Sequence, residues 1–190
     1  NRFEKKIQRI IRFIIPKVNP DDYETQFKYM NSTDLSGLFP NSNAIYLMAF
    51  TKKHYLRRSN PYVRIDGVCQ IPNEYLYYYD IMAVNRDTTE TDDTISFEQL
   101  GKQDMCVAHE PYVVIISKSW KSDYSTIPNL HFIHWKHSNT FPVIVVRYLL
   151  DLKSVKGQEF SNILKTFDGE SHEHPMYGFN IGVPIIQYYN

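Results

Sequence analysis

The sequence lacks the features that mark disulfide-rich, membrane-spanning and nucleotide-hydrolysing proteins. Only 2 cysteines occur among 190 residues, so at most one disulfide could form, and a reduced, soluble, intracellular protein is expected. No window reaches the roughly 18 uninterrupted apolar residues that a membrane span needs. The 7 glycines are scattered and form no phosphate-cradling motif. Because the chain begins at Asn1 rather than Met, we expect an excised domain or a processed product.

Charge and aromatic content narrow the class of partner. The formal net charge is zero, so no strong global field draws the chain to nucleic acid or to an anionic membrane. Aromatic residues make up 15% of the sequence, and 15 residues are tyrosines. Such residues suit the surfaces of β-sheets and the interfaces between proteins. The composition therefore favours a protein partner and calls for no cofactor.

Hydrophobic periodicity predicts a small number of helices. Residues 2–15 place apolar side chains at helical spacing with basic residues on the other side, and Pro16 ends this N-terminal amphipathic helix. A shorter helix is expected from Asp21 or Asp22 through Met30, and one helical turn at Ser96 to Leu100. Residues 160–167 again repeat apolar side chains at helical spacing, which predicts a helix that packs on a sheet.

The other apolar segments predict strands. We expect Leu130 to Asp151 to form a β-hairpin, in which the polar residues 138–140 make the turn. Its second strand is apolar nearly throughout, as expected for a strand that is covered on both faces. The acidic residues 85–94 are expected to form a solvated loop inserted between strands. Residues 1–190 thus predict a single α+β domain with a mostly antiparallel sheet, the N-terminal helix and one or two further packing helices. Strands are predicted at residues 43–50, 62–70, 74–84, 112–116, 130–137, 141–152 and 183–189.

Histidines are the candidates for catalysis or metal binding. His131 and His134 lie on opposite faces of their predicted strand, because side chains alternate along a strand. A histidine-dependent enzyme acting on nucleic acid or a nucleotide needs two convergent imidazoles, and its candidate catalytic residues are His131, His134 and His172. His172 and His174 are the candidate metal ligands, although zinc would need two more. Solvated loop histidines are the simpler interpretation of that pair.

Two stretches are candidate binding surfaces. Residues 51–60 (TKKHYLRRSN) interleave basic and aromatic side chains, which can hold phosphates and stack bases. An exposed edge strand or turn, whose lysines discourage strand pairing, explains the same residues. The tyrosine run at residues 75–79 indicates either a central strand or an exposed face that contacts a partner. The candidate binding residues are Lys52, Lys53, Tyr55, Arg57, Arg58, Tyr77 and Tyr79.

The last third of the chain resembles a known family. Residues 130–190 contain, in order, PVIVVRYLL, KGQEFSNILKTF, EHPMYG and VPIIQYY. This order is similar to the core of the autophagy E2-like enzymes, which conjugate ubiquitin-like autophagy proteins. The resemblance implies a catalytic cysteine after a second HP dipeptide beyond the terminal strand, and no such cysteine follows residue 183 here. It therefore implies a truncated piece or a non-catalytic relative that serves as a binding module.

Three functions follow as hypotheses. The leading one is a non-catalytic protein-interaction domain that docks a partner through an aromatic-rich sheet surface. The second is the histidine-dependent enzyme. The third is a nucleic-acid-binding domain that uses the basic residues 52–58.

Overall fold

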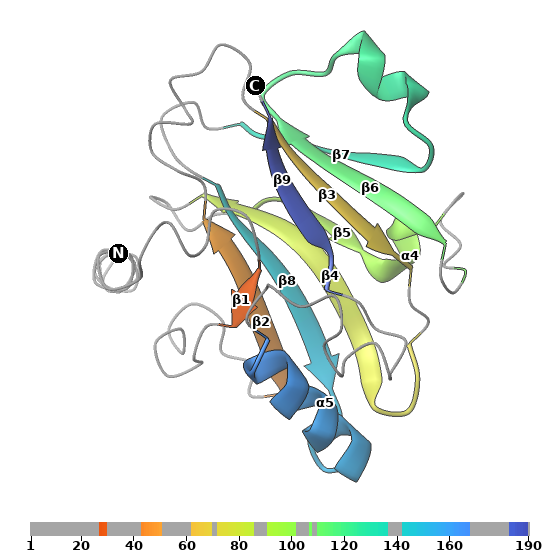
Figure 1. Cartoon of the computed structure of the whole chain (residues 1–190), viewed down its shortest axis with the longest axis vertical. Coiled ribbons are helices and arrows are strands. Elements are labelled where there is room, and N and C mark those ends of the chain that lie inside the picture. Colours follow the sequence, from red (N-terminus) through yellow and green to blue (C-terminus); the bar gives the residue numbers. More distant parts are fainter. Residues whose placement is uncertain are drawn as a thin grey trace.

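A computed structural model of the protein describes residues 27–29, 43–50, 62–69, 72–85, 91–101, 107, 110–136, 142–167 and 183–189. The strands within these ranges form two sheets, with one longer helix at the lower end of the molecule in Figure 1. The predicted helix at residues 2–15 lies outside the described residues. The shorter helix predicted from Asp21 or Asp22 through Met30 is wrong near its end, because Lys28–Tyr29 form a strand that pairs with the next one along the chain. The first residues of that predicted helix lie outside the described ranges.

The larger sheet has five strands, and every neighbouring pair in it is antiparallel. Its long central strand β8 lies between β2 and β4, so both edges of β8 are paired. In spatial order the strands are β1 (Lys28–Tyr29), β2 (Ala44–Phe50), β8 (Pro142–Leu150), β4 (Leu76–Asn85) and β5 (Thr91–Ser96).

The smaller sheet has four strands and contains one parallel pair. Strand β3 is antiparallel to both β6 and β9, whereas β6 and β7 run parallel. The prediction of a mostly antiparallel, sheet-rich structure with few helices is thus confirmed for the described residues. In spatial order the strands are β7 (Leu130–His134), β6 (Pro111–Ser117), β3 (Tyr62–Val68) and β9 (Ile185–Tyr189).

The inward faces of the two sheets bury one shared apolar cluster. Alternate residues of β3, such as Val63 and Ile65, lie in this cluster together with Leu47 from β2 and Val146 from β8. Burial of such side chains is the main favourable contribution to folding. The opposite face of the five-stranded sheet buries a second cluster, which includes Val145 of β8. Strand β8 is therefore covered on both faces, as its continuous apolar run predicts.

The predicted hairpin at Leu130 to Asp151 is wrong. Its two strands belong to different sheets, because β7 pairs with β6 while β8 pairs with β2 and β4. The hydrophobic patterns of the two strands give the physical reason. A strand that is apolar on both faces is best buried at the centre of a sheet, whereas the alternating pattern of β7 suits an edge. The turn residues 138–140 lie outside the described residues.

The predicted loop at residues 85–94 is also wrong in part. Thr91–Ser96 form β5, which pairs with β4 across a register shift at Ala83 and Val84. This strand lies at the edge of its sheet, where the Asp93 side chain is exposed while Ile95 is buried against the core. β-Branched residues at positions 91, 94 and 95 favour the extended backbone.

Three helical segments lie within the described ranges. The single turn α4 (Phe97–Leu100) follows β5, where Gln99 accepts a hydrogen bond from the Ser96 backbone N–H at 3.0 Å. The 3-10 helix η2 (Ser122–Thr126) precedes β7. The helix α5 (Val155–Lys165) follows β8 and buries Phe160 and Leu164 in the shared core. The sequence predicts α4 and α5, and both predictions are confirmed.

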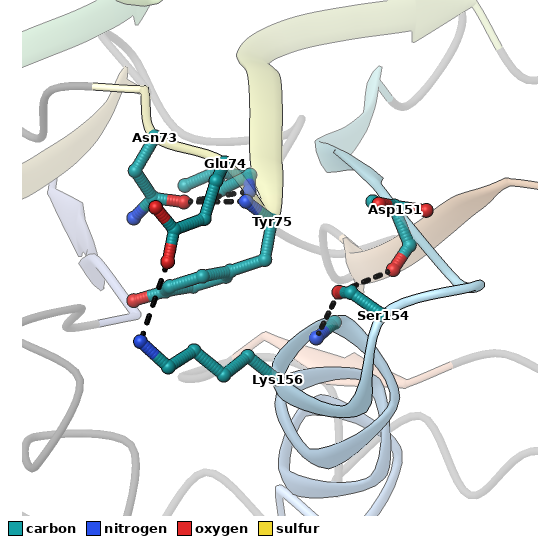
Figure 2. A network of polar contacts seen from close by, with 8 residues as sticks. Asn73, Glu74, Tyr75, Asp151, Ser154 and Lys156 are labelled. Carbon is teal, nitrogen blue, oxygen red and sulfur yellow. Dashed lines mark hydrogen bonds and ion pairs between the residues drawn. The ribbon is translucent and has the colours of Figure 1, made fainter.

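The first turn of α5 is held closely against the end of β8 (Figure 2). The Ser154 hydroxyl donates to the Asp151 carbonyl at 3.0 Å and accepts from the Gly157 N–H at 2.9 Å, which caps the helix. Lys156 faces Glu74 at 3.3 Å, and both side chains are largely exposed, so this ion pair contributes little to stability. A Cβ added to Gly157 would lie 1.9 Å from the Asp151 carbonyl oxygen. The turn therefore requires glycine at this position.

We expect Gly157→Ala to lower the free energy of unfolding by about 1–3 kcal/mol, because the new methyl group overlaps a main-chain oxygen that cannot move alone. Chemical denaturation with circular dichroism measures the change. The matched control is Glu159→Ala, an exposed position on the same helix, which should shift the value by no more than about 0.5 kcal/mol. Equal stability of Gly157→Ala and the control would contradict this packing.

Candidate functional site

His131 is held by the main chain at the start of β7. Its Nε2 atom lies 3.1 Å from the Leu100 carbonyl oxygen and 3.1 Å from the Asn129 Oδ1 atom. Both atoms are acceptors, so Nε2 carries the proton and donates to them. The same Leu100 carbonyl accepts from the Asn129 amide at 2.9 Å and from the Cys69 thiol at 3.3 Å. These contacts support a structural role for His131.

His134 lies on the other side of β7. Its Nε2 atom is 2.8 Å from the Lys118 carbonyl oxygen and must donate to it. Its ring stacks on Phe132 with the centroids 6.5 Å apart. The structure thus does not bring His131 and His134 together. Within the ranges that it describes, no three His, Cys, Asp or Glu side chains gather closely enough to hold a metal ion.

Several candidate residues lie outside the described ranges. Contact of residues 52–58 with phosphates and bases stays a prediction. Metal or proton chemistry at the histidine pair near residue 173 stays a prediction as well. These residues are Lys52, Lys53, Tyr55, Arg57, Arg58, His172 and His174. In the described part of the chain, no helix is long and apolar enough to cross a membrane.

The tyrosine run at residues 75–79 belongs to a central strand. Tyr77 is 51% exposed, whereas Tyr79 is only 4% exposed and packs in the shared core. The ring of Tyr79 contacts Phe97 of α4 and Tyr148 of β8. The prediction that Tyr79 contacts a partner is therefore wrong for the folded domain. Strand β4 lies between β8 and β5, where the core needs large apolar side chains on its inner face.

One ion pair on the outer face of the five-stranded sheet joins a buried carboxylate to a partly exposed guanidinium. The Arg147 guanidinium donates to both oxygens of Asp80, at 3.2 Å from Nε and 2.5 Å from Nη2, and Asp80 is fully buried. Register places Tyr46 and Asp80 on either side of Arg147, and Tyr46 also hydrogen-bonds it. The hydroxyl of Tyr78 donates to Asp80, and its ring lies 5.5 Å from the guanidinium.

Burial dominates the electrostatics of this pair. Burial raises the pKa of Asp80, and the hydrogen bonds and positive charge of Arg147 offset only part of that rise. Burial also raises the pKa of Tyr46 and of Tyr78. This cluster supplies an ion-pair partner for Asp80, which is the one fully buried carboxylate among the described residues.

The outer surface of the four-stranded sheet carries a continuous group of aromatic rings. In β3, Val63 and Ile65 point into the core, so Tyr62 and Arg64 lie on the outer side. Register aligns Tyr62 with Tyr189 of β9, and the two rings stack with the centroids 5.0 Å apart. We call this surface the aromatic face. Its rings are Tyr62, Trp120, Tyr124, Phe132 and Tyr189.

Trp120 is the most exposed ring of the aromatic face. It follows β6 just before η2 and is 52% exposed. Its ring meets Tyr124 at 5.5 Å and Phe132 at 5.3 Å, both nearly perpendicular. The ammonium of Lys121 lies 4.9 Å from the centroid of the Tyr62 ring, a favourable cation–π distance. A half-exposed tryptophan that packs on other rings, with a cation over another ring of the same face, is an arrangement suited to contacting another molecule.

Sequence reasoning missed the aromatic face. It placed the binding tyrosines on β4, although the alternation of Tyr62, Arg64 and Asp66 against Val63 and Ile65 does indicate an outward tyrosine on β3. Trp120 follows a strand in a polar segment, where no periodicity identifies its exposure. A tryptophan between serine and lysine was the only available signal.

Comparisons with known proteins assign no family. No family model matches the chain, and no curated protein matches it. A solved structure of an uncharacterised protein from Burkholderia cenocepacia is similar over 87% of this chain and 35% of that protein, with a TM-score of 0.46 and 10% identity. The VPA0106 protein from Vibrio parahaemolyticus is similar over 85% and 34%, with a TM-score of 0.46 and 8% identity. The chain spans about a third of the length of each.

None of these comparisons bears on the resemblance of residues 130–190 to the autophagy E2-like enzymes. That resemblance stays a prediction, and the two strands of its expected hairpin lie in different sheets.

We expect His131 and His134 to occupy the tautomer that carries the proton on Nε2. Long-range ¹H–¹⁵N spectra of the neutral imidazoles, recorded at alkaline pH, distinguish the two tautomers. Protons on Nδ1 of either residue would leave Nε2 open to a metal or a substrate. That result would contradict the structural role described above.

We expect Arg147→Met to lower the free energy of unfolding by about 3–5 kcal/mol at neutral pH, because it leaves Asp80 buried without its cation. The pKa of the unpaired carboxyl then rises further above its unfolded value. Such a group loses stability as pH rises through the interval between those two pKa values. The deficit should therefore be largest at neutral pH and shrink as pH falls toward the ordinary carboxyl pKa of about 3.9.

The matched control for Arg147→Met is the double variant with Asp80→Leu, which removes both charges. It should recover most of the lost stability, since an apolar pair can replace a buried ion pair at little cost. Denaturant titrations between about pH 4 and pH 7 measure both variants. A single variant whose deficit is independent of pH would show that Asp80 is not the cause.

Proposed function

We propose that this chain is a non-catalytic protein-interaction domain that docks a protein partner through the aromatic face. The observation that carries the proposal is Trp120, which is half exposed on a sheet surface whose other rings hold it in place. Tryptophan and tyrosine are enriched at the residues that dominate binding energy in protein interfaces. Because neighbouring rings already order Trp120, little side-chain entropy is lost when a partner binds.

The chemistry of the aromatic face defines the partner that we propose. Trp120 offers apolar contact, and Lys121 adds a positive charge over the Tyr62 ring of the same face. Arg64 is already engaged by Asp66, with two hydrogen bonds of 2.8 Å, so this pair adds no net charge. The partner should present an apolar or aromatic side chain against Trp120 and a carboxylate within reach of Lys121. Such a carboxylate fixes orientation more than it adds affinity.

Other observations support docking over catalysis. The Nε2 atoms of both described histidines are engaged by main-chain carbonyls. A general base or metal ligand at either residue would have to give up that hydrogen bond. The nucleic-acid alternative, led by Lys52, Lys53, Arg57 and Arg58, stays a prediction for residues outside the described ranges.

Trp120→Ala should weaken binding of the partner at least about tenfold, as loss of a central aromatic anchor does. The wild-type domain and the variant serve as parallel baits for capture and cross-linking, and the affinity of the purified partner is then measured for each. Because Trp120 is half exposed, the variant should unfold within about 1 kcal/mol of wild type.

Val155→Ala is the matched control, because Val155 is an exposed apolar residue on α5, away from the aromatic face. It should leave affinity unchanged. Lys121→Glu should also weaken binding if a partner carboxylate faces it. The same captured proteins at the same affinity for wild type and Trp120→Ala would contradict the proposal.

A further inference from the structure

Strand β9 forms one edge of the four-stranded sheet (Figure 1). It pairs with β3 over five residues without a register shift, and it pairs with no other strand in the described part of the chain. Its outer-face residue Ile185 is 46% exposed, while the next residue, Ile186, is buried in the core. An edge strand can pair through its backbone with a further strand.

The other three sheet edges carry features that discourage such pairing. Strand β1 has only two residues. Strand β5 has consecutive aspartates at 92 and 93 and a register shift in its pairing with β4. Strand β7 is five residues long, lies against β5 and carries His131 and His134. Short strands, charges and bulges are the usual protections of an edge.

Strand β9 has five residues, as β7 does, but it lacks the charges, the histidines and the register shift of the other edges. Its sequence, IIQYY, contains no charged residue and no proline, and its backbone follows β3 in unbroken register. Among the four edges that the structure describes, β9 is thus the one suited to pairing. Its residues are also β-branched or aromatic except for Gln187, a composition typical of paired strands.

The pattern of β9 complements itself. If two copies pair antiparallel about Gln187, each Ile185 lies opposite the second copy's Tyr189 on the outer face. That ring is already ordered by stacking on Tyr62. Cross-strand pairs of an aromatic and a β-branched residue stabilise antiparallel sheets. Gln187, which accepts a hydrogen bond from the Tyr189 hydroxyl at 2.6 Å, would meet its own counterpart without charge repulsion.

We propose that the occupant of this edge is a second copy of the chain, and that β9 pairs with the second copy's β9 about a two-fold axis. The two four-stranded sheets then form one continuous sheet of eight strands. The aromatic faces of both copies lie on the same side of that sheet. A five-residue strand pair buries less than the roughly 1,200 Å² of a standard stable interface. The dimer is therefore weak and depends on concentration, and it does not require the protein partner proposed above.

Sedimentation equilibrium from about 1 µM to about 1 mM tests the pairing, a range that covers dissociation constants of weak complexes. Wild type should form a dimer as concentration rises. Gln187→Lys and Gln187→Glu place like charges opposite each other at the two-fold axis, which destabilises the pair. Each should raise the dissociation constant at least about tenfold. An equimolar mixture of the two variants should restore association as a heterodimer.

Val155→Lys adds the same charge on α5, at an exposed position away from β9, and should leave the dimer unchanged. Thermal melts confirm that each variant is folded. Gln187→Glu faces Arg64 across the β3–β9 pair, so a glutamate is well tolerated within one copy. A wild type that stays monomeric at about 1 mM overturns the proposal. A dimer that neither Gln187 variant weakens, or a mixture that stays monomeric, also overturns it.

Discussion

The Leu100 carbonyl joins the two sheets of this protein. Leu100 ends α4, which continues directly from β5 of the five-stranded sheet. Its carbonyl oxygen accepts hydrogen bonds from the side chains of Cys69, Asn129 and His131, which all lie in or next to strands of the four-stranded sheet. Apolar packing between the sheets is strong but has no direction. Three directional bonds to one buried carbonyl set how the sheets meet at this end of the core.

This arrangement explains why the most reactive side chains among the described residues have structural roles. His131 and Cys69 hold α4, His134 holds the segment after β6, and Asp80 with Arg147 links β4 to β8. A buried polar group without a partner destabilises the folded state, so these side chains keep the hydrogen bonds and ion pairs that they form within the fold. On the outer side of the four-stranded sheet, several aromatic side chains stay partly exposed while they contact one another. There Trp120, Tyr62 and Tyr189 lie on a rigid support, which is the condition for docking with little loss of entropy.

The sequence predicts most of the strands and the helix α5, because alternation and helical spacing are local properties. The apolar run of β8 also predicts that this strand is covered on both faces. Strand pairing is not local. Residues 130–151 contain two strands and a polar turn, yet their partners are β6 on one side and β2 and β4 on the other. Which sheet a strand joins depends on the burial available across the whole molecule.

The candidate site was less predictable than the fold. The Leu100 carbonyl collects donors 29 to 31 residues away in sequence, and Asn129 reaches it from a backbone φ of 48°, which no spacing rule anticipates. Trp120 packs on Tyr124 of η2 and on Phe132 of β7. These contacts are tertiary, so local sequence patterns do not predict them. The tyrosines of β4 were the more obvious candidates, but Tyr79 is buried in the core.

We propose that a partner is recognised on the aromatic face, while the buried polar groups stabilise the fold. Hydrogen–deuterium exchange of the domain with and without its purified partner tests this claim most directly. If the partner docks on the aromatic face, binding should slow exchange in β3, in residues 117–127 and in β9. Exchange in α5 and in β2 should not change. Protection confined to α5 or to the five-stranded sheet would contradict it.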